Sequence, residues 1–315
     1  FAKIRSSFGA MEYQQKIYII LALILIFIAP IFIIKIQDAR KAKEAASLVT
    51  EMQPIAVPLE NDVNVIRIEN LNTVLSASNA QKILNLKGQI FAITQTEIID
   101  VKENKSFPIP QNFQSPVQIA QMDDLNLIFL MNAGSEITSF SPISKKFSAN
   151  TINVPVGSKI SGIGTYLTYI YLVDQKNNQV YRYPRAEGGF GEKSDWLKDT
   201  VDFANMTDIA INENIFVSTE NSVIKMFRGK NQNLTLPGTT TSIHIDKLSL
   251  GEQTGSLFIL DRQNSRVIQL DPENKIKAQY YNPEIASISS LTVDEQNGLI
   301  YLASEKDIKT IPFNK

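Results

Sequence analysis

The chain has 315 residues, and its 31 Lys and Arg side chains nearly balance 32 Asp and Glu, giving a formal net charge of -1. No excess of positive charge is available to hold a phosphate backbone, so no nucleic-acid partner is expected. Because the chain contains no cysteine and one histidine, disulfides, thiolate nucleophiles, iron–sulfur clusters and Cys/His zinc sites are excluded.

An apolar run near the N-terminus predicts a membrane anchor. Residues 17–34 read IYIILALILIFIAPIFII between Lys16 and Lys35, and a helix of this length spans about 27 Å at about 1.5 Å per residue, close to the ~30 Å hydrocarbon core. The alternatives are a buried soluble helix and a signal peptide, but a signal peptide has a shorter apolar core followed by a small-residue cleavage site. We expect a single-pass transmembrane helix over residues 17–36, held in the lipid bilayer, after a juxtamembrane segment over residues 1–16.

The orientation of this anchor depends on the size of the domain on its C-terminal side. Three basic residues precede the apolar run and four come closely after it. The rule that basic residues stay on the cytoplasmic side of the membrane therefore does not decide the orientation. A large domain after an anchor is translocated largely regardless of such charges. We therefore expect a cell-membrane protein with its large domain extracytoplasmic. Residues 37–59 are predicted to form a helical stalk and linker, because helix formers give way to Pro54 and Pro58.

A repeat runs through the rest of the chain. Each copy has an aliphatic residue, then an aromatic residue, and a small polar residue three positions after the aromatic one, and the aromatic residues are spaced by 38, 42, 45, 42 and 43 positions. The copies are IFAIT (90–94), IFLMN (128–132), IYLVD (170–174), IFVST (215–219), LFILD (257–261) and IYLAS (300–304). Further β-rich runs precede and follow each copy, and four strands at a period near 42 describe a propeller blade. The predicted fold is all-β, a six-bladed β-propeller over residues 60–315 preceded by the transmembrane α-helix.

Ring closure supplies a further expectation. The chain ends just after the third strand of the sixth copy, while the strand-like run VNVIRIEN (63–70) belongs to no complete repeat. We expect strand 63–70 to pair antiparallel with the third strand of the sixth copy, around Ile308 to Ile311. This pairing would leave no unpaired strand edge where the first and last blades meet. A seventh blade would need another pentapeptide between residues 60 and 88, and the sequence has none there.

Two segments carry a family resemblance. IYLVDQKNNQVYRY (170–183) and LFILDRQNSRVIQLD (257–271) resemble NHL-like six-bladed propeller repeats, in which a strand ends in Asp, turns through Asn and resumes. More narrowly, YRYPRAEGGFGEKSDWL (181–197) is similar to part of the membrane-anchored propeller region that follows metal-dependent protein-phosphatase-like domains in poorly characterised bacterial proteins. This resemblance implies an anchored propeller. It implies no phosphatase activity, because the chain contains no such domain.

Few residues are candidates for chemistry. Asp174 and Asp261 occupy equivalent turn positions and could bind a cation, but Thr, Asn or Ser fills this position in the other copies, so we expect caps for the turn backbone. His244 and Asp246 would lie on one face of a strand, yet no G-x-S-x-G presents a nucleophile, and a histidine packed within a blade is expected. GGFG (188–191) lacks the setting of a phosphate loop and is predicted to be a turn.

The insertion RAEGGFGEKSDWLKD (185–199) holds the candidate binding residues Phe190 and Trp196, the latter being the sole tryptophan. Loops on a rigid scaffold often carry recognition, and Trp is favoured at binding hot spots; the alternative is a hydrophobic plug over the neighbouring blade. The predicted function is a non-catalytic sensor or scaffold module that binds a protein or small molecule, with no cofactor, metal or catalytic residue. The runner-up is a calcium-dependent propeller hydrolase of the lactonase type, with calcium held by several blades at the central mouth.

Overall fold

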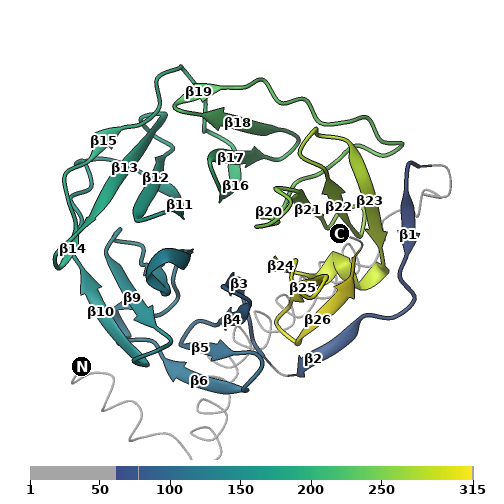
Figure 1. Cartoon of the computed structure of the whole chain (residues 1–315), viewed down its shortest axis with the longest axis horizontal. Coiled ribbons are helices and arrows are strands. Elements are labelled where there is room, and N and C mark those ends of the chain that lie inside the picture. Colours follow the sequence, from purple (N-terminus) through teal and green to yellow (C-terminus); the bar gives the residue numbers. More distant parts are fainter. Residues whose placement is uncertain (1–61, 77, 314–315) are drawn as a thin grey trace, which may run out of the picture. The chain divides into compact units, whose positions relative to one another are not determined.

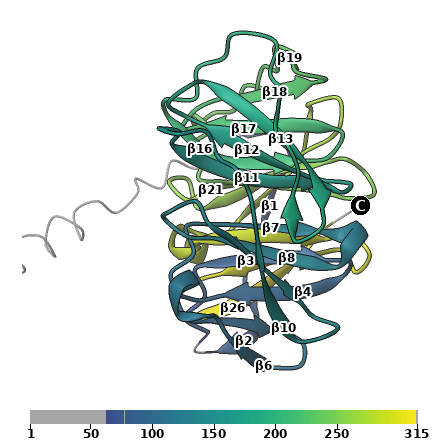
Figure 2. The ribbon, with the colours of Figure 1, turned by 90° about the vertical axis from the view of Figure 1, so that its left-hand side faces the viewer.

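The structure is a computed structural model that describes residues 62–76 and 78–313. Within these residues, six separate sheets are arranged as a ring around a central axis (Figure 1). Seen from the side, the sheets follow one another around the axis as tilted blades (Figure 2). The predicted all-β, six-bladed propeller is confirmed.

The first three blades follow one another in chain order, each with its first strand innermost. Blade 1 contains β3 (Lys82–Leu86), β4 (Gln89–Ile93), β5 (Glu97–Asp100) and β6 (Lys105–Pro108). Blade 2 contains β7 (Gln118–Met122), β8 (Leu127–Met131), β9 (Ile137–Ser141) and β10 (Lys146–Asn150). Blade 3 contains β11 (Ile160–Tyr166), β12 (Tyr169–Asp174) and β13 (Gln179–Ala186), with the short β14 (Gly189–Phe190) and β15 (Ser194–Asp195) both paired to β13.

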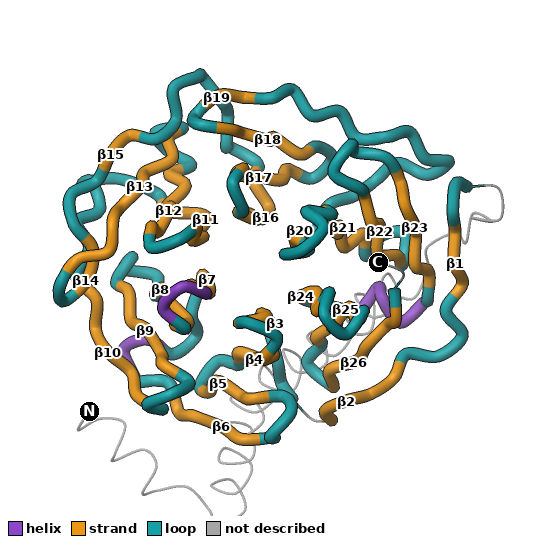
Figure 3. The backbone as a smooth tube through the Cα atoms, in the orientation of Figure 1, coloured by secondary structure: helices purple, strands orange, loops and turns teal. Residues whose placement is uncertain are grey.

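The remaining blades complete the ring. Blade 4 contains β16 (Met206–Ile211), β17 (Asn214–Thr219), β18 (Val223–Phe227) and β19 (Lys230–Asn231). Blade 5 contains β20 (Lys247–Leu250), β21 (Leu257–Asp261), β22 (Arg266–Leu270) and β23 (Ile276–Tyr281), and blade 6 contains β24 (Ser290–Asp294), β25 (Leu299–Ala303) and β26 (Asp307–Pro312). Strands make up the blades and loops join them, with short 3-10 segments at Gln111–Phe113, Asp123–Leu125 and Pro283–Ser287 (Figure 3).

The repeated pentapeptides coincide with the second strand of every blade. These strands read as continuous apolar runs because both faces of a blade pack against neighbouring blades. Phe91 of blade 1 shares a buried cluster with Phe140 of blade 2, and Phe216 of blade 4 shares another with Ile259 of blade 5. The hydrophobic core is therefore a series of layers between the blades.

The polar residue that ends the pentapeptide caps the following turn in five of the six copies, whereas Thr219 of the fourth copy bonds to Ser222 instead. Asp174 is fully buried and accepts hydrogen bonds from the backbone N–H groups of Lys176 (3.1 Å) and Asn177 (3.2 Å). Asp261 accepts one from the N–H of Asn264 at 3.1 Å. Thr94, Asn132 and Ser304 accept equivalent backbone bonds. The turn-cap prediction is confirmed.

Residues 62–76 close the ring, but the strand predicted to do so, 63–70, was wrong. The fourth strand of blade 6 is β2 (Asn72–Ser76), which pairs antiparallel with β26 in the register Asn72↔Thr310 and Ser76↔Asp307. Within the predicted strand 63–70, only β1 (Val65–Arg67) is a strand, and it runs parallel to β23 as a fifth strand of blade 5.

Polar side chains of blade 5 explain this difference. The guanidinium of Arg266 is fully buried between Asp261, at 2.8 Å from Nε, and Asp62, at 3.4 Å from Nη1. Side-chain amides of Gln279 and Asn282 donate to the backbone carbonyls of Val63 and Ile68, at 2.8 Å and 2.9 Å. Blade 5 thereby holds residues 62–68 against its own outer edge, which leaves the next segment to pair with β26.

The predicted juxtamembrane segment (1–16), transmembrane helix (17–36) and stalk (37–59) lie outside the described residues. Residues 62–76 and 78–313 include no helix that is both long and apolar enough to cross a membrane.

Candidate functional site

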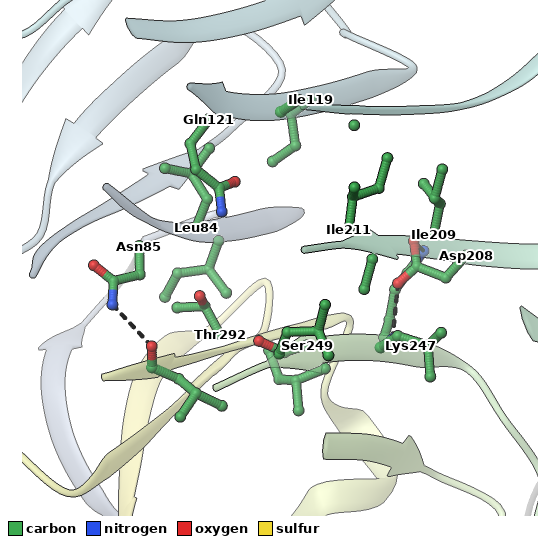
Figure 4. Close-up of a pocket in the computed structure, with 18 of the residues that line it drawn as sticks. Leu84, Asn85, Ile119, Gln121, Asp208, Ile209, Ile211, Lys247, Ser249 and Thr292 are labelled. Atoms are coloured by element: carbon green, nitrogen blue, oxygen red, sulfur yellow. Dashed lines mark hydrogen bonds and ion pairs between the residues drawn. The ribbon is translucent and has the colours of Figure 1, made fainter. Parts of the chain in front are cut away.

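The candidate site is the central channel. The first strand of every blade contributes to its wall, and the cavity within it has a volume of about 200 Å³. Figure 4 shows side chains from several of these strands converging on one space. Since the six first strands run in the same direction along the axis, residues that begin them lie at one end of the channel and the turns after them lie at the other.

The end where the first strands begin carries two lysines and one aspartate. The amine of Lys247 lies 3.7 Å from Asp208 Oδ1, and Asp208 Oδ2 accepts the N–H of Leu248 at 2.8 Å. Lys82, which begins β3, lines the same cavity and is partly buried. Burial lowers the pKa of Lys82, as does the positive charge of Lys247, whereas Asp208 acts in the opposite direction. We call these three residues the lysine end of the channel.

The wall next to the lysine end combines apolar and polar side chains. Ile119 of β7 and Ile209 and Ile211 of β16 line it, together with the polar Gln121 and Ser249 (Figure 4). Ile211 can pack closely against β11 because that strand has a glycine there: a Cβ on Gly164 would overlap the Ile211 side chain.

The opposite end of the channel is acidic. Burial raises the pKa of Asp123, which sits in the β7–β8 turn, although the positive charge of Lys87 and a hydrogen bond from the Lys87 backbone act in the opposite direction. The pKa of Glu252 is raised by burial and by the negative charges of Asp123, Glu295 and Asp294. Glu295 is buried and accepts the N–H groups of Gln253 at 2.5 Å and Thr254 at 3.1 Å, so it shapes the β20–β21 turn. The two ends of the channel thus differ in the sign of their charge.

No group of three or more histidine and carboxylate side chains capable of holding a metal ion occurs within residues 62–76 and 78–313. The hydrolase alternative stays a prediction.

The structure places Phe190 in the core. Its side chain is 8% exposed, its ring centroid lies 5.5 Å from that of Phe129 in blade 2, and the guanidinium carbon of Arg185 lies 5.1 Å from its centroid. The flanking backbone continues the contact with blade 2, because Thr151 donates its N–H to Gly188 at 3.1 Å and accepts that of Phe190 at 2.8 Å. The turn predicted at 188–191 is thus the end of a hairpin that fastens blade 3 to blade 2.

Trp196 is half-buried and packs edge-on against Tyr171, with ring centroids 5.9 Å apart. Its backbone N–H donates to Val180 at 2.8 Å, and the next residue but one, Lys198, donates to Gly229 of the β18–β19 turn at 2.8 Å. This is the arrangement expected of the hydrophobic plug. The structure does not bring Trp196 and Phe190 together at the channel, and a binding role for either ring stays a prediction.

His244 lies in the loop before β20, so its predicted position on a strand was wrong. Its Nε2 atom is 3.0 Å from Glu220 Oε1 and its Nδ1 atom is 3.5 Å from Asp246 Oδ2. Asp246 is bound more closely by Arg262, whose Nη2 and Nε atoms lie at 2.6 Å and 2.8 Å. These residues form a polar cluster at the rim of blade 5.

Sequence reasoning missed the lysine end. Lys82 and Lys247 each begin the first strand of a blade, and this shared position was available from the repeat alignment. The alignment does not say which of the first-strand residues face the channel, because the blade twist decides that.

Six sheets arranged around a central channel make the described residues a six-bladed β-propeller. No protein-family model matches the chain, and no curated protein matches it either. Three solved structures are similar to it in fold. They are a structural genomics protein of unknown function from Bacteroides thetaiotaomicron VPI-5482 (14% identity, TM-score 0.55, 79% of this chain and 76% of that chain), streptogramin B lyase (13%, 0.52, 81% and 97%) and the WD40 repeats of RRP9 (11%, 0.54, 78% and 98%). At these identities the similarity concerns the fold alone.

Proposed function

We propose that the chain is a single-pass membrane protein whose extracytoplasmic propeller is a non-catalytic sensor module, and that the ligand is a small molecule held in the central channel. The observation that carries this proposal is the cavity of about 200 Å³ to which all six first strands contribute. A ligand in this cavity would lie among the first strands of all six blades. Its binding would therefore act on the whole ring, as a sensor requires.

The proposal of a membrane anchor rests on the apolar run over residues 17–34. Because the chain has no cysteine, single cysteines report its topology directly. We expect a membrane-impermeant maleimide to label Ser144→Cys, in the exposed β9–β10 turn, on intact cells. Ser6→Cys should be labelled only after the cells are opened. The reverse pattern would place the propeller in the cytoplasm.

Ligand binding is tested by filling the channel. Ser249 lines the cavity, and a Ser249→Phe side chain would occupy much of it. The full chain in detergent is dialysed against a small-molecule extract of its own cells, and retained compounds are identified by mass spectrometry. Compounds retained by the unchanged chain should be lost with Ser249→Phe and kept with Ser144→Phe, which adds the same ring at an exposed site. Equal retention by all three would refute the proposal, and chemical conversion of a retained compound would refute its non-catalytic part.

A further inference from the structure

The lysine end of the channel has one positive charge more than it can neutralise from its own residues. Among the described residues that line this end of the cavity, Asp208 is the one carboxylate that opposes Lys82 and Lys247. Asp208 is already engaged, at 3.7 Å from the Lys247 amine and at 2.8 Å from the N–H of Leu248. Among the residues that the structure describes, no carboxylate lies within 4.0 Å of the Lys82 amine.

Lys82 is partly buried, so its charged amine has less water around it than an amine on the open surface. A charge removed from water is costly unless a partner of opposite sign compensates for it. The lowered pKa of Lys82 has that origin, since burial and the charge of Lys247 outweigh the attraction of Asp208. A lysine that is perturbed by burial and by a neighbouring charge, and that lines a cavity, is a candidate for a functional site.

We infer that the lysine end binds the carboxylate of a small organic acid, with Lys82 as the charged contact that the Lys247–Asp208 pair leaves free. This inference rests on the proposed function of the channel. The net charge of +1 matches one carboxylate. A dianionic phosphate would leave a negative charge uncompensated.

The rest of the channel fits the remainder of such a ligand. The side chains of Ile119, Ile209 and Ile211 line the same cavity, so a short apolar tail would replace water against them. The cavity volume of about 200 Å³ is many times the ~10–15 Å³ that one water molecule needs, so a small acid fits within it.

The acidic end sets the direction of binding. Asp123 and Glu252 lie around the far end of the cavity, and both are in its wall. They repel a carboxylate that enters or shifts toward them, whereas Lys82 attracts it. A channel with opposite charge at its two ends therefore binds an acid in one orientation, with its charged group at the lysine end.

The test compares acids with neutral molecules of the same shape. The full chain in detergent is titrated by calorimetry with butyrate, benzoate, butyramide and inorganic phosphate. We expect at least one of the two carboxylates to bind at least tenfold more tightly than butyramide and phosphate, because only a carboxylate combines a hydrogen bond to the charged amine with a single compensating charge.

Two variants locate the site. Lys82→Met should weaken binding of the acid at least tenfold. Lys306→Met, which removes the same charge from the exposed β25–β26 turn, should leave the affinity unchanged. Thermal melting checks folding of both variants, and Lys82→Met should melt no lower than the unchanged chain because a partly buried charge is lost.

Each contrary outcome overturns the inference. Failure of both acids to bind, equal binding of butyramide, tighter binding of phosphate, or unchanged affinity in Lys82→Met would each do so. If the acids fail while Ser249→Phe still abolishes retention of another compound, the channel is a binding site for a different class of ligand. In that case the proposed function stands and the inference falls.

Discussion

Leu71 provides the most direct test of ring closure. It lies just before β2, is 8% exposed, and packs in the cluster between blades 5 and 6 that includes Phe258, Leu291 and Ile311. Replacing a buried leucine by alanine costs about 2–5 kcal/mol. Because Leu71 keeps a little exposure, we expect Leu71→Ala to lower the free energy of unfolding by about 2–4 kcal/mol. For a domain of this size, that corresponds to a melting temperature lower by about 4–16 °C.

Val74, three residues further on in β2, offers a matched control. Its side chain is 44% exposed, so Val74→Ala should change the free energy of unfolding by about 0.5 kcal/mol or less. Thermal denaturation of the full chain in detergent, followed by near-ultraviolet circular dichroism, compares the two variants. If Leu71→Ala melts within a degree or so of Val74→Ala, the N-terminal segment contributes nothing to the ring, and the assignment of β2 to blade 6 is refuted.

Three further predictions concern the buried polar groups and the hairpin of blade 3. Arg266→Met leaves two buried carboxylates without their arginine and should lower the free energy of unfolding by about 3–5 kcal/mol. Arg262→Met breaks a pair whose arginine is 47% exposed and should lower it by about 1 kcal/mol or less. Denaturant titration measures both values, and equal losses would refute the buried network. Burial raises the pKa of Asp123 above its usual value near 3.8, so the folded state binds the proton more tightly and loses stability as the pH rises through that raised pKa. The melting temperature of Asp123→Asn relative to the unchanged chain should therefore rise from pH 3 to pH 7, and a constant difference would contradict this. An added Cβ at Gly189 would overlap the backbone of blade 2, whereas one at Gly238 would meet nothing within 4 Å; Gly189→Ala should speed hydrogen exchange in β14, and Gly238→Ala should leave it unchanged.

The blade count was predictable because it depends on a local property. A strand buried on both faces must be apolar at nearly every position, and the second strands, such as Leu257–Asp261, satisfy this requirement whatever their neighbours are. The caps were predictable for the same reason, since Asp174 bonds to the N–H groups two and three residues later.

The closing strand was not predictable in the same way. The run 63–70 is richer in β-branched residues than Asn72–Ser76, and propensity alone favours it. Its position is decided by Arg266, about 200 residues away in sequence, whose buried guanidinium takes Asp62 as a partner. Such a pairing depends on the assembled blade.

The candidate site shows the same division. An aromatic insertion such as 185–199 stands out in sequence, and the structure explains it by contacts that fasten blade 3 to blades 2 and 4. The lysine end does not stand out, because Lys82, Asp208 and Lys247 come from three blades and meet only when the ring is formed.

The pairing of β1 with β23 and of β2 with β26 also has a consequence for the order of events during synthesis. The two N-terminal strands are made first, and β2 then waits for a partner 238 residues later at the Asn72–Thr310 contact. At about 5–20 residues per second, this delay is on the order of 10–50 s. The partner of β1 emerges earlier, because β23 precedes β26. Docking of β1 on blade 5 would then hold β2 beside the place where the last blade forms, and the ring would close around a strand already in position.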